Sequence, residues 1–146
     1  MQKVKLSSLP TFAKDVLQSL DSARDKSHAT LVALRGDLGA GKTTFTQALA
    51  RELGIAATVQ SPTYILMRKY QITNHKFQTL IHIDAYRLEN PKEFAALQPE
   101  QFLKDPKTLV VVEWPEKVAG ALPPADVTIN FSSDGAKEGE RYIEVV

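Results

Sequence analysis

A glycine-rich loop between an apolar strand and a helix constrains this chain more than any other feature. Residues 36–43 read Gly-Asp-Leu-Gly-Ala-Gly-Lys-Thr, which fits the pattern of glycine, four residues, glycine, lysine and serine or threonine. The apolar run 30–34 predicts a buried strand before the loop, and the spacing of apolar residues in 42–53 predicts a helix after it. An incidental glycine-rich turn would not need these two flanking elements. The loop therefore predicts a phosphate-binding site.

The residues of this loop have distinct expected roles. Glycines let the backbone turn tightly and bring its N–H groups against phosphate oxygens, and the following helix adds its positive N-terminal end. Lys42 is expected to reach the β- and γ-phosphates, Thr43 to place its hydroxyl on magnesium, and Thr44 to bond the α-phosphate. The loop residues expected to contact the nucleotide through their backbone are Gly39, Ala40 and Gly41.

A phosphate site also needs a carboxylate for the metal, normally at the end of a neighbouring strand. Two apolar runs end in an acid, one at Asp84 and one at Glu113. Either side chain could hold magnesium directly or through water, and the other could then orient the attacking water. Each could also be an ordinary acid at the end of a strand, but the presence of both beside a P-loop favours a functional role.

Several function classes are disfavoured by what the chain lacks. It has no cysteine, which excludes disulfides, thiolate zinc sites and cysteine nucleophiles. The guanine-reading string Asn-Lys-x-Asp is missing, so ATP is the expected nucleotide. His28, His75 and His82 do not have the spacing of metal ligands, and His82 is expected to be a hydrogen-bonded structural residue within a strand. The chain is also short for a small-molecule kinase, which usually adds a lid and an acceptor pocket.

The remaining periodicity predicts an α/β fold in a single P-loop domain spanning residues 1–146. The expected architecture is a three-layer P-loop NTPase-like fold, in which a mixed sheet has a parallel centre with antiparallel hairpins at its side. A helix is expected from Pro10, and Pro99 should divide a helical segment that begins after Asn90 into two short pieces. The expected strands, besides 30–34 and a possible edge strand at 3–6, cover residues 64–72, 77–84, 109–112, 127–131 and 142–146.

Charge and hydropathy give little reason to expect a membrane or direct nucleic-acid binding. The formal net charge is +1, from 18 basic and 17 acidic residues, so no overall field favours anionic partners. No apolar segment follows the first lysines, which argues against a secretory signal, and the longest apolar runs, such as 109–112, are far too short to span a bilayer. The expected location is the cytoplasm.

Beyond the P-loop, the chain resembles the TsaE family, the P-loop ATPases of bacterial tRNA threonylcarbamoyladenosine synthesis. Four motifs carry the resemblance in the family's order, and Leu122-Pro123 and Arg141 also fit. These motifs are Gly36 to Thr44, Ser61-Pro62-Thr63-Tyr64, His82 to Leu88, and Val112-Glu113-Trp114-Pro115-Glu116. One departure is Gln98, which stands where the family commonly has glycine after leucine, so a different bend is expected before Pro99.

The resemblance implies an ATPase of low intrinsic activity that works with partners. In the family, a complex of TsaB and TsaD makes the modification at adenosine 37 of tRNAs that read codons beginning with A, and a separate enzyme supplies threonylcarbamoyl-adenylate. The TsaE-type protein binds that complex, and its ATP cycle resets it, so contact with tRNA is indirect. The resemblance also places Thr43 and Glu113 at magnesium and Thr11 near the nucleotide base.

Two other functions are compatible with the same residues. One is a small kinase that transfers the γ-phosphate to a metabolite, and the other is a nucleotide-gated binding module without useful turnover. Tyr86 and Trp114 follow the two acidic strand ends, where exposed aromatic rings would suit contact with a partner or base. Ordinary half-buried packing of these rings is an equally acceptable interpretation.

Overall fold

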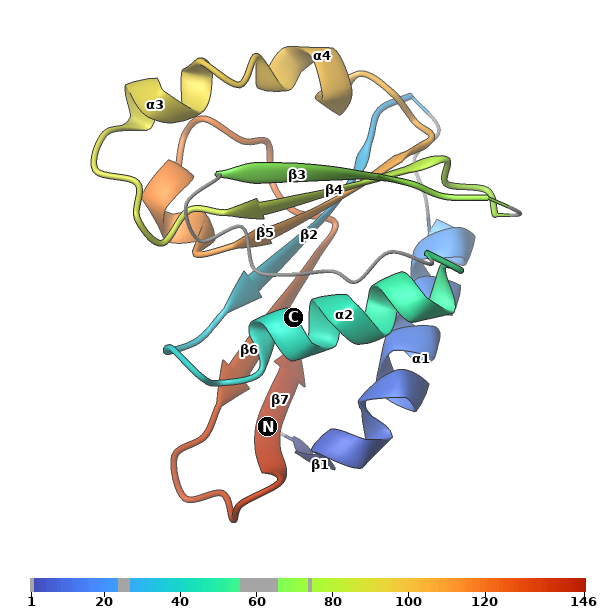
Figure 1. The fold of residues 1–146 in the computed structure, drawn as a ribbon, viewed down its shortest axis with the longest axis vertical. Coiled ribbons are helices and arrows are strands. Elements are labelled where there is room, and N and C mark those ends of the chain that lie inside the picture. The colour runs from blue at the N-terminus through green and yellow to red at the C-terminus, as the bar shows by residue number, and fades with distance from the viewer. Residues whose placement is uncertain (1, 24–26, 56–65, 74) are drawn as a thin grey trace.

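The computed structural model describes residues 2–23, 27–55, 66–73 and 75–146. Within these residues, seven strands form one sheet in the order β1-β7-β6-β2-β5-β4-β3 (Figure 1). The strands are β1 Gln2–Lys5, β2 Thr30–Arg35, β3 Met67–Gln71, β4 Thr79–Asp84, β5 Thr108–Glu113, β6 Val127–Ser132 and β7 Glu140–Val145. The expected Ser61-Pro62-Thr63-Tyr64 motif lies outside the described residues.

The centre of the sheet is parallel and its two sides are antiparallel. Strand β2 pairs in parallel with β6 on one side and with β5 on the other, and β5 pairs in parallel with β4. The pairs β3–β4, β6–β7 and β1–β7 are antiparallel. This arrangement confirms the predicted mixed sheet. It also places β5, which ends in Glu113, next to the P-loop strand β2, and β4, which ends in Asp84, one strand further away.

Helices cover both faces, which makes a three-layer α/β fold. On one face, α1 (Leu9–Ala23), which follows the short 3-10 helix η1 (Leu6–Ser8), packs beside α2 (Lys42–Glu52). On the other face lie α3 (Pro91–Ala95), α4 (Pro99–Leu103) and the 3-10 helix η2 (Pro115–Val118), as Figure 1 shows. None of the helices in the described part of the chain is long and apolar enough to cross a membrane.

Side chains alternate between the two faces of the central strands and form two separate hydrophobic cores. The side chains of Leu109 and Val111 on β5 pack with α1 and α2, whereas Val110 and Val112 pack with Phe94 and the other face. All six residues of β5 are buried, as expected for a parallel strand that is covered on both faces. Because Glu113 continues this alternation, its side chain lies on the α1–α2 face.

The predicted division of the helical segment after Asn90 is confirmed. The Asn90 side chain caps α3 by accepting a hydrogen bond from the Lys92 N–H at 2.9 Å. Helix α3 ends before Gln98, whose φ of 52° is in the left-handed region. Glycine adopts this conformation without strain, whereas it costs other residues about 1–2 kcal/mol. The glutamine therefore carries local strain at the bend between α3 and α4.

The β3–β4 hairpin is shorter than the sequence predicted. Strand β4 begins at Thr79 rather than at Phe77, because the Phe77 N–H donates to His75 Nδ1 at 3.1 Å and the two rings stack with centroids 5.6 Å apart. This local hydrogen bond competes with ladder pairing. Hydrophobicity alone assigned Phe77 to the strand, but the residue is a buried anchor of the turn.

Gly36 and Gly39 provide a test of how the P-loop is held on the sheet. A Cβ at Gly36 would lie 2.5 Å from the Phe131 carbonyl oxygen, and φ there is +145°; Gly39 has φ +74° but no atom within 4 Å of such a Cβ. We expect Gly36→Ala to reduce the free energy of unfolding by about 2–5 kcal/mol, from overpacking and backbone strain together. Gly39→Ala should cost only about 1–2 kcal/mol of strain. Urea denaturation of both variants measures the difference, and equal losses would contradict this account.

Candidate nucleotide and metal site

The loop between β2 and α2 presents the start of a helix to a pocket. Gly36, Gly39 and Gly41 all have positive φ angles, of 145°, 74° and 109°. Gly41 is the N-cap residue of α2 and makes no side-chain capping bond. The N–H groups of the first helical turn therefore receive no cap from this residue and keep the partial positive charge of a helix N-terminus.

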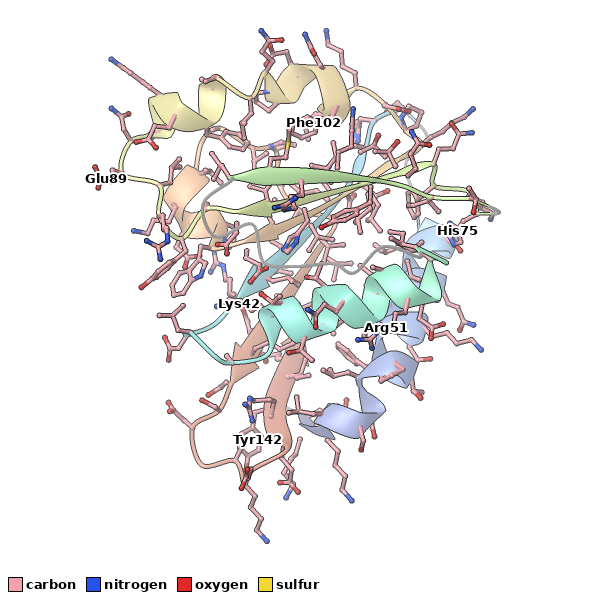
Figure 2. The ribbon with its side chains drawn as sticks, viewed as in Figure 1. Lys42, Arg51, His75, Glu89, Phe102 and Tyr142 are labelled. Carbon is pink, nitrogen blue, oxygen red and sulfur yellow. The ribbon has the colours of Figure 1, made fainter. Side chains whose placement is uncertain are left out.

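Most of the residues predicted to form the site line one pocket of about 160 Å³. From the loop and α2, the lining residues are Leu38, Gly39, Ala40, Gly41, Lys42, Thr43 and Thr44. Asp84 from β4 and Glu113 and Trp114 from the end of β5 complete the wall. Figure 2 labels Lys42 at the start of α2, beside the ends of these strands. The parallel pairing explains the convergence, because parallel strands bring their carboxyl ends to the same edge.

Glu113 is the most constrained acid in the pocket. Its carboxylate is buried, with only 2% of the residue exposed. The Thr43 hydroxyl lies 3.1 Å from Oε1 and 3.2 Å from Oε2, and the Nε2 atom of His82 lies 2.5 Å from Oε2. Buried carboxylate oxygens need such hydrogen-bond partners to offset the loss of water.

Lys42 is held at the same pocket by the loop itself. Its ammonium donates to the Gly36 carbonyl and, at 3.0 Å, to the Asp37 carbonyl, and it lies 4.1 Å from the centre of the Trp114 ring. The residue is only 4% exposed. Burial lowers the pKa of this ammonium, while nearby carboxylates, with Glu113 first and Asp84 second, oppose that effect. An added anion would favour the charged form further.

Asp84 has a different environment from Glu113. The two residues are directly paired in the β4–β5 register, but Asp84 is partly exposed and its Oδ1 accepts the Tyr86 N–H at 3.0 Å. The sequence left open which acid serves the metal. The two acids differ in their hydrogen bonds. Of the bonds described above, the one from the Thr43 hydroxyl goes to Glu113, whereas Asp84 accepts from the Tyr86 N–H.

The aromatic residues beyond the strand ends pack on each other. The rings of Tyr86 and Trp114 are 5.1 Å apart and tilted by 44°. Tyr86 is 38% exposed, whereas Trp114 is partly covered and has a left-handed φ of 60°. Half-buried packing therefore describes Trp114, whose ring lies against Lys42, whereas contact of the exposed Tyr86 ring with a partner or base stays a prediction.

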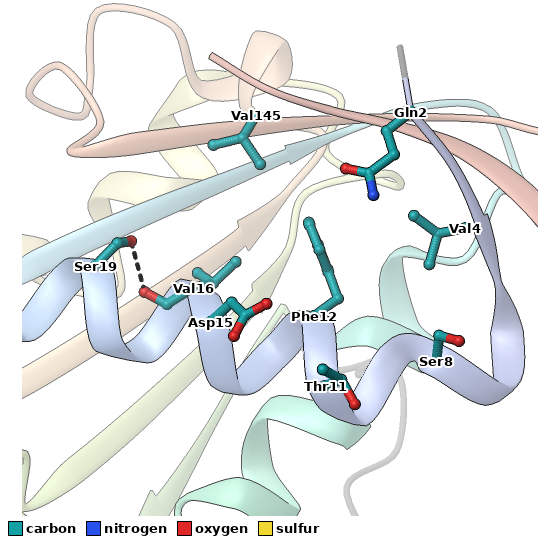
Figure 3. Close-up of a pocket in the computed structure, with 9 residues that line it drawn as sticks. All are labelled: Gln2, Val4, Ser8, Thr11, Phe12, Asp15, Val16, Ser19 and Val145. Atoms are coloured by element: carbon teal, nitrogen blue, oxygen red, sulfur yellow. Dashed lines mark hydrogen bonds between the residues drawn. The ribbon is translucent and has the colours of Figure 1, made fainter.

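Thr11 lies elsewhere among the described residues. It lines a separate crevice of about 400 Å³ between α1, β1 and Val145, which Figure 3 shows, and this crevice has no lining residue in common with the P-loop pocket. The next residue, Phe12, packs on Phe45 of α2 with ring centroids 5.6 Å apart. The start of α1 is thus beside α2, but the crevice on which Thr11 lies is not the one that holds Lys42.

Sequence analysis did not identify Arg141 as a site residue. The Arg141 guanidinium, on β7, donates from Nη2 to the Gly39 carbonyl at 3.2 Å and from Nη1 to the Glu140 carbonyl at 2.6 Å. It therefore fastens the last strand to the middle of the P-loop. No local motif marks this contact, since the two residues are 102 positions apart, and only the strand order brings them together.

Known proteins resemble this chain in sequence over most of its length. The family described as "Threonylcarbamoyl adenosine biosynthesis protein TsaE" matches residues 6–143. A relative from Haemophilus influenzae, named tRNA threonylcarbamoyladenosine biosynthesis protein TsaE, is 38% identical over 70% of this chain and 63% of its own length. A relative of the same name from Treponema pallidum is 38% identical over 75% of this chain and 78% of its own.

A solved structure extends the comparison to the fold. The crystal structure of YdiB from Bacillus subtilis aligns with a TM-score of 0.63 and 28% identity, covering 97% of this chain and 80% of that one. The aligned region of the Haemophilus influenzae relative is less than two thirds of its length. Since the family match spans nearly all of the residues that build the sheet and the P-loop pocket, this chain belongs to the TsaE family.

Proposed function

We propose that this chain is a cytoplasmic, magnesium-dependent ATPase of tRNA threonylcarbamoyladenosine biosynthesis that acts with a TsaB–TsaD-type complex and meets tRNA only through it. The convergence of Lys42, Thr43 and Glu113 on one pocket at the start of α2 carries the proposal. The names of the relatives supply the pathway. The near-neutral charge of the chain agrees with a protein that does not hold tRNA by itself.

The donor set at Thr43 and Glu113 fits magnesium. Both groups offer oxygen, which Mg²⁺ prefers, and adjacent ligands of an octahedral ion with Mg–O distances of about 2.0–2.1 Å are about 3 Å apart. The Thr43 oxygen lies 3.1 and 3.2 Å from the Glu113 carboxylate oxygens. These two residues would hold the ion directly or through water, and the ion would neutralise charge on the phosphates.

The remaining groups of the pocket would bind and orient the phosphates. The backbone of Gly39, Ala40 and Gly41 and the hydroxyl of Thr44 would surround them, and Lys42 would place its charge on the β- and γ-phosphates. Asp84 would orient the attacking water, because it is the partly exposed acid of the pair. Thr11 remains a proposed contact near the base, supported by the position of Phe12 beside α2.

The low intrinsic activity implied by the family gives the first test. We expect slow ATP hydrolysis by the isolated chain and a clear acceleration when the cognate TsaB–TsaD pair is added, since positioning of the water and phosphates would be completed by partners. Phosphate release measured with and without the pair, in magnesium, decides the question. Phosphate appearing on a metabolite instead of in water would favour a kinase, and tight binding without turnover in either condition would favour a binding module.

Loss of the P-loop ammonium gives the second test. Lys42→Ala should reduce partner-stimulated ATP hydrolysis by about 10²-fold or more, because a charge-assisted contact to the phosphates is lost. Lys117→Ala is the matched control. Lys117 is an exposed lysine of the neighbouring η2, so this substitution removes the same charge away from the pocket wall. Circular dichroism of both variants confirms folding. A folded Lys42→Ala protein that hydrolyses ATP at the parent rate would overturn the phosphate assignment.

The two acids should respond differently to neutralisation. Glu113→Gln is expected to weaken nucleotide binding in magnesium more than in EDTA, whereas Asp84→Asn should mainly reduce turnover and leave binding near the parent value. The reason is that, among the bonds described above, the Thr43 hydroxyl donates to Glu113 and not to Asp84. Titration calorimetry and phosphate release measure the two effects. The opposite pattern would mean that the two roles are reversed.

A further inference from the structure

His82 has a contact that a purely structural residue on this strand would not need. It is fully buried, and its Nε2 lies 2.5 Å from Oε2 of Glu113. We propose that His82 is a positioning residue that fixes the orientation of the Glu113 carboxylate for the metal site. This inference rests on the magnesium site proposed above, and it assigns to His82 a role beyond the structural one that its sequence context suggests.

The sheet geometry explains how the imidazole reaches the acid. Asp84 pairs with Glu113 and His82 pairs with Val111 across β4 and β5. Residues two apart on a strand share a face, so His82 and Glu113 are diagonal neighbours on the α1–α2 side. The two side chains come from elements 31 positions apart in sequence. Both β4 and β5 are interior strands that are paired on each side.

The hydrogen-bonding pattern shows what His82 adds. The Thr43 hydroxyl has one proton and is nearly equidistant from the two carboxylate oxygens of Glu113, at 3.1 and 3.2 Å. Thr43 alone therefore does not distinguish the two oxygens. Nε2 of His82 contacts only Oε2, and it must be the donor because a carboxylate oxygen accepts. This contact breaks the symmetry and leaves Oε1 as the oxygen available to the metal or its water. Hydrogen bonds of this kind orient ligands and tune their affinity.

The other imidazole nitrogen argues against a purely structural role. Among the described residues, Nδ1 of His82 is buried and has no hydrogen-bond partner. An unsatisfied buried polar atom costs free energy, so an apolar side chain such as that of Leu80 on the same face would serve the core better. The only described polar contact of the imidazole is the one to Glu113. Because His82 has no exposed surface, it would act through Glu113 rather than on the nucleotide.

Two amide substitutions separate reach from polarity. In His82→Gln, the side-chain nitrogen is the same number of bonds from Cα as Nε2 of histidine, so it can still donate to Glu113. In His82→Asn, the amide ends at the position of Nδ1 and is one bond too short. His82→Leu removes the donor and keeps an apolar core. Val111→Ala is the control for a weakened strand pair. Val111 pairs with His82 in the sheet, but its apolar side chain offers no hydrogen bond to the Glu113 carboxylate.

The measurement is ADP affinity by calorimetry, in saturating Mg²⁺ and in EDTA, for each folded variant. We expect His82→Leu and His82→Asn to lose about 10–100-fold of the affinity gained from magnesium, with little change in EDTA. His82→Gln should keep most of the affinity gained from magnesium. Val111→Ala should lower thermal stability and leave that gain in affinity unchanged. If the leucine variant does not fold, the asparagine and glutamine pair makes the same comparison.

The possible failures are distinguishable. If the parent protein binds ADP equally with and without magnesium, the proposed metal site is wrong. If the parent depends on magnesium and His82→Asn depends on it to the same extent, only the role of His82 is overturned. A magnesium dependence that is lost equally in His82→Gln and His82→Asn also overturns it, because the donor at Nε2 would then not be the cause.

Discussion

The parallel pairing of β2 with β5 is the interaction on which the site depends. Leu34, one residue before the end of β2, is in register with Glu113 at the end of β5, so the strand that enters the P-loop and the strand that carries the buried acid end within one residue of each other. Beyond the two strands, the chain continues toward opposite faces of the sheet. After β2 it passes through glycines into α2, and after β5 it passes through the left-handed Trp114 into η2. The gap between these turns is the pocket, and its polar groups come from both sides.

Carboxylates of the protein partly offset the burial of the lysine in this pocket before any ligand is considered. Burial acts against the ammonium of Lys42, and the carboxylates of Glu113 and Asp84 act for it. The indole of Trp114 covers the ammonium, a contact worth about 0.5–2 kcal/mol. A phosphate group would therefore enter a site in which the positive charge is already desolvated, so its attraction to Lys42 would be stronger than at an exposed lysine.

Local pattern predicted the parts of this structure that depend on neighbours in sequence. The P-loop, the two acidic strand ends, the capped helix after Asn90 and the parallel centre all follow from spacing and residue type. Contacts that depend on strand order could not be predicted in the same way. The bond between His82 and Glu113 and the bond between Arg141 and Gly39 join residues 31 and 102 positions apart. Periodicity says which face a side chain occupies, but not which strand lies beside it.

The pairing of β1 with β7 links the order of folding to the nucleotide pocket. Gln2 pairs with Ile143, so this edge of the sheet joins segments from near the two ends of the described chain. Closing so long a loop costs more entropy than forming the local turns, and contacts of this kind usually form late. Strand β7 also carries Arg141, which bonds to Gly39. The strand that joins the two ends of the described chain is therefore also the strand that supports the P-loop, because β7 is paired with both β1 and β6.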